Sequence, residues 1–117
     1  MTRLRLRILF GSAMLGPGKA ELLERIRDAG SISAAGRGMG MSYKRAWSLV
    51  EEMNAAFTEP LVLSARGGAG GGGAHLSPAG EAVLTHYHAV EDAAATGGAA
   101  HLAALQAMLR PDMAGGK

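Results

Sequence analysis

A glycine run near the middle of the chain constrains the fold most strongly. Residues 67–73 comprise six glycines and one alanine, which leaves too little side chain for the interior of a helix or a sheet. Residues 61–66 before the run have the length and composition of a strand, and residues 74–77 after it suit a second short strand. We therefore expect a β-hairpin with a long glycine-rich tip. A disordered linker is the alternative, and both interpretations hold if the tip becomes ordered only on binding DNA.

Three helices are expected before this hairpin. The first covers residues 19–29 and stops at Gly30. The second is short, about residues 34–39, begins at a serine cap and contains small side chains that allow a close helix crossing. Gly40 then makes a turn and Ser42 caps the third helix. That helix has a buried stripe at intervals of three and four, with Trp47 at its border: Ala46, Val50, Met53 and Phe57.

The two ends of the chain complete the expected topology. Residues 3–8 alternate arginine with aliphatic side chains, and this period of two predicts a half-buried edge strand. A helix from Pro78 to about Ala95 and an amphipathic segment over 100–110 follow the hairpin. We expect a mainly α protein with a small β-hairpin wing. Its parts are a winged helix-turn-helix domain over 1–77, a helical dimerisation arm over 78–110 and a loose tail over 111–117.

Composition excludes several classes of protein. The chain has no cysteine, so it can form neither disulfides nor thiolate metal sites. The opening residues lack the continuous apolar stretch of an export signal. No run approaches the ~20 apolar residues of a membrane span. We therefore expect a cytoplasmic protein without a membrane partner.

Charge is unevenly distributed although the formal net charge is only +2. Residues 29–50 contain Arg37, Lys44 and Arg45 but no acid until Glu51, and residues 60–80 contain Arg66 but again no acid. Two acid-free basic segments would attract a polyanion. The alternative is chance spacing of the ten acidic residues.

The start of the third helix is the candidate site for DNA. Tyr43, Lys44 and Arg45 add two cations and a hydroxyl to the positive end of the helix. In a helix-turn-helix this helix enters the major groove. We expect Arg45 to read guanine through its forked guanidinium and Lys44 to contact phosphate. The alternative is that both are solvated surface charges. The full set of expected DNA contacts is Ser33, Arg37, Ser42, Tyr43, Lys44, Arg45, Ser48, Arg66, Gly68, Gly70 and Gly71.

Catalytic, metal and nucleotide sites find no support. His86 and His88 are two residues apart on a helix and therefore point in different directions. The glycine run lacks the Lys-Ser/Thr ending of a P-loop. No catalytic arrangement is legible at local spacing. We interpret Trp47, Met53 and Phe57 as core, and expect no enzyme activity, cofactor or metal.

Several motifs together resemble one family of regulators. The G-S-I-S of residues 30–33 precedes M-S-Y-K-R-A-W over 41–47 and E-M-N over 52–54. A glycine-rich wing follows, and it leads into A-H-L-S over 74–77. In combination these motifs resemble the amino-terminal domain of the ModE family of molybdate-responsive transcription regulators, over roughly residues 4–94. The DNA-binding domain of LysR-type regulators is a more distant likeness.

The resemblance implies a dimeric regulator. It implies a homodimer joined through the arm helices and a palindromic operator whose half-sites lie about one helical turn, ~34–36 Å, apart. Family members that sense molybdate do so in carboxy-terminal domains, for which this sequence has no room, so we expect no molybdate binding. A winged-helix protein-interaction module and a non-specific architectural DNA binder are the alternatives. The residues expected at the dimer contact are Val83, Leu84, Tyr87, Val90, Leu102 and Leu105.

Overall fold

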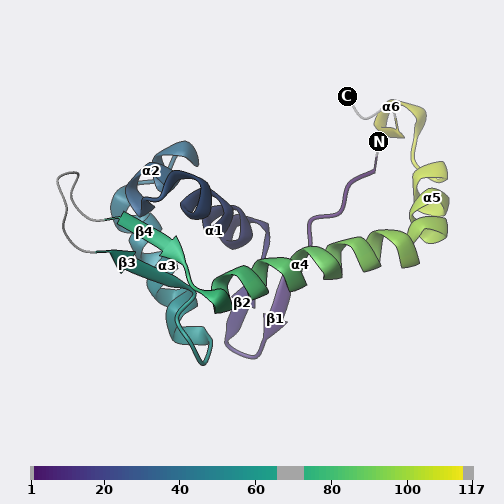
Figure 1. The fold of residues 1–117 in the computed structure, drawn as a ribbon. Coiled ribbons are helices and arrows are strands. Elements are labelled where there is room, and N and C mark those ends of the chain that lie inside the picture. Colours follow the sequence, from purple (N-terminus) through teal and green to yellow (C-terminus); the bar gives the residue numbers. More distant parts are fainter. Residues whose placement is uncertain (1, 66–72, 115–117) are drawn as a thin grey trace.

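The computed structural model describes residues 2–65 and 73–114. It is mainly helical, and a small antiparallel hairpin follows the third helix (Figure 1). This arrangement confirms the expected winged helix-turn-helix. The elements are β1 (Ile8–Phe10), β2 (Ala13–Leu15), α1 (Pro17–Ala29), α2 (Ile32–Gly38), α3 (Tyr43–Ala56), β3 (Val62–Ala65), β4 (Gly73–Leu76), α4 (Pro78–Gly97), α5 (Ala99–Ala107) and α6 (Pro111–Ala114).

The core lies where α1, α3 and the wing meet. Pro17 occupies the first turn of α1, and Gly30 ends the helix with a φ of 71°, as expected of a glycine that follows a helix. Helix α1 therefore starts two residues earlier than predicted. The largest fully buried side chains come from α1, α3 and the residue before β3: Leu22, Leu23, Ile26, Val50, Met53 and Leu61.

Helices α2 and α3 cross at a glycine. A Cβ added at Gly36 would lie only 2.8 Å from the Cβ of Ala46, so any larger residue there would push the two helices apart. Gly40 makes the turn between them with a φ of 72°. The hydroxyl of Ser31 accepts a hydrogen bond from Ala34 N, and that of Ser42 accepts one from Arg45 N, each at 3.1 Å. Both predicted serine caps are confirmed.

The wing is held to the helices by hydrogen bonds to its backbone groups. Strands β3 and β4 pair antiparallel from Val62↔Leu76 to Ala65↔Gly73, which confirms the expected hairpin. The side chain of Asn54 near the end of α3 accepts from Leu61 N at 2.8 Å and donates to Val62 O at 3.1 Å. The amide of Ala74 in turn donates to Gly30 O at 2.9 Å. The glycine-rich tip, residues 66–72, lies outside the described residues.

The predicted amino-terminal strand is wrong. Within the described residues, 2–7 are extended but unpaired, and the strand begins at Ile8 and pairs with β2 around Gly11. The carbonyl of Leu6 accepts a hydrogen bond from the hydroxyl of Tyr87 at 2.7 Å, so a side chain of α4 satisfies the backbone in place of a neighbouring strand. A period of two specifies an extended conformation and an apolar face, but not a strand partner.

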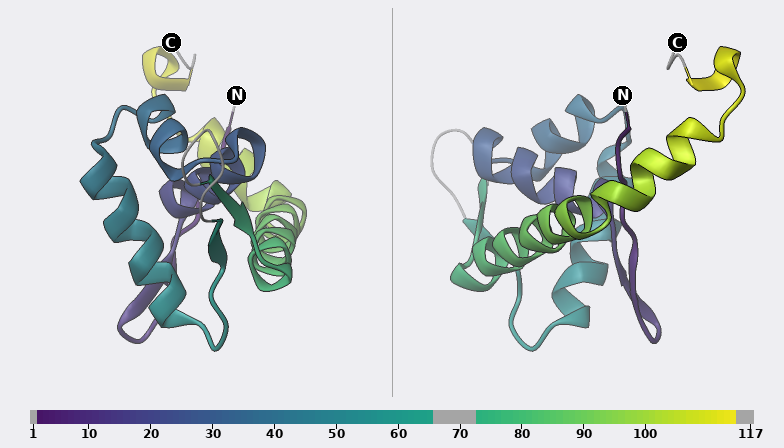
Figure 2. Two further views of the ribbon diagram at one scale, coloured as in Figure 1. Left: turned by 60° about the vertical axis from the view of Figure 1, so that its left-hand side comes forward. Right: turned by 90° about the vertical axis from the view of Figure 1, so that its right-hand side faces the viewer.

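Helix α4 leaves the body of the molecule as an arm (Figures 1 and 2). The radius of gyration is 17.3 Å, against about 13 Å for a compact domain of this length. No residue of α5, all of which are described, is buried. The expected loose tail is in part helical, because Pro111 opens the short helix α6.

Candidate nucleic-acid interface

The start of α3 presents an exposed positive surface. Tyr43, Lys44, Arg45 and Ser48 are all exposed, as is the capping residue Ser42. Because the first unpaired amides of a helix carry partial positive charge, Lys44 and Arg45 reinforce the field of the helix end. Five of the expected contact residues are thus brought together at one end of α3.

A second pair of expected contacts lies on α2. The guanidinium of Arg37 donates to the hydroxyl of Ser33 at 3.0 Å. This bond orients an exposed cation on the helix that precedes the turn. In a helix-turn-helix the first helix crosses the DNA backbone, so Arg37 is suited to a phosphate rather than to a base edge.

The acids of α3 lie further along the helix, and one of them forms an ion pair with a lysine of α1. The ammonium group of Lys19 in α1 is nearly buried; it pairs with Glu52 and donates to Met14 O at 3.0 Å. The hydrogen bond and charge of Lys19 hold the pKa of Glu52 below its ordinary value, and the charge of Arg45 acts in the same direction. The carboxylate is therefore ionised but paired, which limits its repulsion of a polyanion.

Trp47 is not a core residue, contrary to the sequence-based expectation. Its side chain is 36% exposed and stacks on Tyr43, which is 58% exposed. Successive residues of a helix point about 100° apart, so burial of Ala46 turns the next side chain outward. Met53 is buried as expected, and Phe57 packs partly buried against the core.

Four of the expected DNA contacts belong to the expected wing and lie outside the described part of the chain. These are Arg66, Gly68, Gly70 and Gly71, so their predicted contacts stay predictions. Within the described residues, a shallow groove separates α3 from β3, and its lining includes Trp47, Val50, Glu51, Asn54, Val62 and Ser64.

Two of the six residues expected at a dimer contact belong to the core instead. Leu84 is 3% and Tyr87 2% exposed within a single chain. The buried residues of α4 all lie in the first half of the helix, where it packs against the core. Val90 and Leu105 are exposed, whereas Val83 and Leu102 are half-buried.

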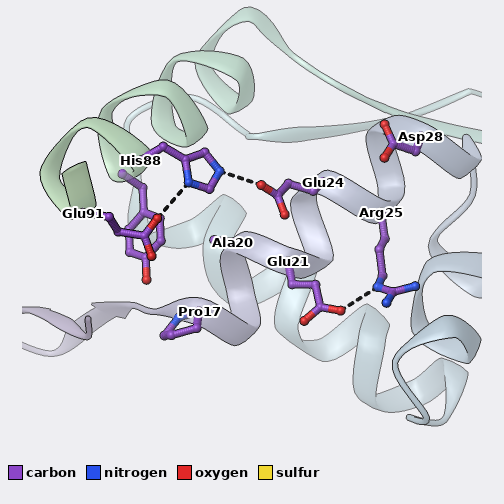
Figure 3. Close-up of a pocket in the computed structure, with 9 residues that line it drawn as sticks. Pro17, Ala20, Glu21, Glu24, Arg25, Asp28, His88 and Glu91 are labelled. Carbon is purple, nitrogen blue, oxygen red and sulfur yellow. Dashed lines mark hydrogen bonds and ion pairs between the residues drawn. The ribbon is translucent and has the colours of Figure 1, made fainter. Parts of the chain in front are cut away.

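One histidine contacts two glutamates between α1 and α4, and the sequence alone did not predict this site (Figure 3). Nε2 of His88 lies 2.5 Å from Oε2 of Glu24, and Nδ1 lies 2.9 Å from Oε1 of Glu91. The hydrogen bond to Glu91, helped by Glu24, raises the pKa of His88 despite partial desolvation. Glu91 was visible in the sequence as a helical i+3 neighbour, but Glu24 is brought close only by the fold. In the described parts of the chain, no three His, Cys, Asp or Glu residues are arranged to hold a metal ion.

Comparison with known proteins points to one group of relatives. The molybdenum-pterin-binding protein MopB of Rhodobacter capsulatus is 48% identical over 79 residues, which cover 68% of this chain and 29% of MopB. The transcriptional regulator ModE of Yersinia pestis is 45% identical over 71 residues, or 61% of this chain and 27% of that protein. The DNA-binding transcriptional dual regulator ModE of Escherichia coli is 42% identical, with the same coverage.

The matched part is a minor share of each relative, since the chain spans less than a third of their lengths. No protein-family model matches the chain. Among the described helices, none is long and apolar enough to cross a membrane. The matches nevertheless agree with the motifs and with the observed fold, and they confirm the expected relationship: over about two-thirds of its length this chain is a homologue of the ModE regulators, consistent with an amino-terminal ModE-like DNA-binding domain.

Proposed function

We propose that this chain binds duplex DNA with sequence specificity and regulates transcription in the cytoplasm, as a homodimer on a palindromic operator. One observation carries the proposal. The exposed first turn of α3 places Lys44 and Arg45 at a positive helix end, directly after a turn that sets α3 across α2. The E. coli relative is named a DNA-binding transcriptional dual regulator, which supports the same function.

Each cation has a distinct role in this proposal. Helix α3 enters the major groove with its first turns at the base edges. Arg45 donates to O6 and N7 of a guanine, Lys44 contacts phosphate, and Ser48 one turn later contacts either. Arg37, held by Ser33, binds the phosphate backbone beside the groove.

Selection from a randomised duplex pool, followed by sequencing of the retained fraction, tests the proposal. We expect a palindrome with two half-sites. Lys44→Ala should weaken binding to all sequences alike and reduce the magnitude of the salt slope by about 1, whereas Arg45→Ala should relax preference at one guanine at a cost of about 1–3 kcal/mol. Arg110→Ala, which removes the same charge at a position between α5 and α6, is the matched control. Retention without sequence enrichment would contradict the proposal and indicate an architectural binder.

The response to molybdate needs a separate measurement. MopB is named as a molybdenum-pterin-binding protein, but the match covers only 29% of it. We propose that the described domain binds DNA without binding the oxyanion itself. Isothermal titration with molybdate and with tungstate should give no stoichiometric heat, and tight one-to-one binding would overturn this part of the proposal.

A protein-interaction module is the second candidate, and one observation favours it. Tyr43 and Trp47 expose apolar surface on the same helix that carries the cations. The two functions differ in their dependence on salt, because contacts to several phosphates make the logarithm of the binding constant fall steeply with the logarithm of salt concentration. No retention of any duplex at low salt would favour the protein-interaction module.

A further inference from the structure

Two aromatic rings form an apolar flank on the helix proposed to enter DNA. The ring centroids of Tyr43 and Trp47 lie 6.4 Å apart with an interplanar angle of 9°. They are one turn apart on α3, and both are exposed although α3 also has a buried face that accepts large side chains. Exposed aromatic surface loses the stabilisation that burial would give it, so this pair is suited to contact with a second molecule.

The flank lies at the end of α3 that carries the positive charge. Tyr43 immediately precedes Lys44 and Arg45, and Trp47 immediately precedes Ser48. A duplex that approaches Lys44 and Ser48 therefore meets the two rings over the same turns of the helix. On the other side, the groove toward β3 begins at Trp47, so the rings lie between the cationic face of α3 and the wing.

The chemistry of the major groove identifies what such a surface recognises. Base edges there present hydrogen-bond donors and acceptors, together with one apolar group, the 5-methyl group of thymine. Lys44, Arg45 and Ser48 can form hydrogen bonds, whereas ring faces pack against methyl groups. Building on the DNA-binding function proposed above, we infer that Trp47, stacked on Tyr43, is a specificity-determining residue that selects thymine by contact with its 5-methyl group.

Deoxyuridine provides the test, because it keeps every hydrogen-bonding group of thymidine and lacks only the methyl group. In the selected operator, each thymine of one half-site is replaced in turn by uracil, and the dissociation constant is measured with the full chain. At one or two positions we expect wild-type affinity to fall about fourfold, the effect of one methyl group no longer buried. Trp47→Ala should bind the thymine and uracil duplexes equally, and Trp47→Phe should keep part of the preference.

Two further readouts separate this inference from the function on which it rests. Lys44→Ala should lower the affinity for the thymine and uracil duplexes by the same factor, so the ratio of the two affinities should stay unchanged. Trp47 is the only tryptophan, so its fluorescence should change when the operator binds. Equal wild-type affinity for all thymine and uracil duplexes would overturn the inference while DNA binding stands, and so would an undiminished preference in Trp47→Ala. Failure of the wild-type chain to bind any duplex would overturn the proposed function itself.

Discussion

The backbone carbonyl of Leu61 shows how single residues join the wing to the arm. It accepts a hydrogen bond from Ser77 N at 2.9 Å, at the point where β4 ends and α4 begins. The hydroxyl of Ser77 caps α4 by accepting from Gly80 N at 3.0 Å and donates to Pro60 O at 2.6 Å. Gly80 packs directly over the Leu61 carbonyl, where an added Cβ would lie 2.3 Å from the oxygen. The direction in which the arm leaves the body thus depends on a residue without a side chain.

Gly80→Ala should therefore destabilise the protein. A backbone oxygen cannot move aside as the end of a flexible side chain can, so we expect a loss of about 1–3 kcal/mol or more in the free energy of unfolding. Gly97→Ala, in the last turn of the same helix, meets no atom within 4 Å and should be neutral or stabilising by up to about 1 kcal/mol. Denaturant titration followed by circular dichroism measures both. Equal stability of the two variants would contradict the packing at Leu61.

At the scale of elements, α1 and α4 are linked by a titratable contact. His88 lies between Glu24 of α1 and Glu91 of its own helix. Its ring is also edge-on to that of Tyr87, with the ring centroids 5.8 Å apart. Arg25 and Glu21, which pair with each other, line the same cleft (Figure 3). The protonated imidazole can donate to both carboxylates at once, whereas the neutral form can donate to only one.

This contact should make stability depend on pH. The pKa of His88 is raised in the folded protein, so its stabilising contribution is fully present below the unfolded value of about 6.5 and is lost as pH rises through the folded value. The melting temperature of the wild type relative to His88→Gln should therefore fall across this window. Because the side chain is 45% exposed, solvent screening keeps the effect modest. The matched control is His86→Gln, at an exposed position two residues earlier, which should follow the wild-type profile. A pH-independent difference between wild type and His88→Gln would contradict the linkage.

The sequence predicted elements wherever local residues determine them. Ser31, Ser42 and Ser77 cap their own helices, and Gly30 and Gly40 have the positive φ that ends or turns a segment. These features depend on a few neighbouring residues, so both the helix-turn-helix and its charged first turn were predictable. The contacts that the sequence did not predict are tertiary ones, between residues far apart in the chain. Leu6 is bonded by Tyr87 and His88 by Glu24, at separations of 81 and 64 residues, and no local pattern encodes those partners.

At the scale of the molecule, the arm exposes apolar surface to solvent. The extents of 56 × 30 × 23 Å reflect α4 and α5 projecting away from the body (Figure 2). The amino-terminal segment reaches this region, where Thr2 bonds to Gln106 at 2.8 Å. The exposed large apolar residues of the arm and of the segment after α5 include Val90, Leu105, Met108 and Leu109. Such a surface is typical of an interface, and in the homodimer proposed above a second copy of the chain would cover it.

We expect the chain to be a dimer in sedimentation equilibrium. The double variant Val90→Glu, Leu105→Glu should be a monomer. Both side chains are substantially exposed, 45% and 61%, so charging them should leave the helical circular dichroism of a single chain unchanged while it adds like charges to a paired surface. Leu63→Glu, at an exposed position on the wing, is the matched control and should remain dimeric. The monomeric variant should still bind one half-site but lose the gain in affinity that two linked half-sites provide. A monomeric wild type, or a double variant that stays dimeric, would show that the arm does not join the subunits, and two-half-site recognition would then require a contact elsewhere in the molecule.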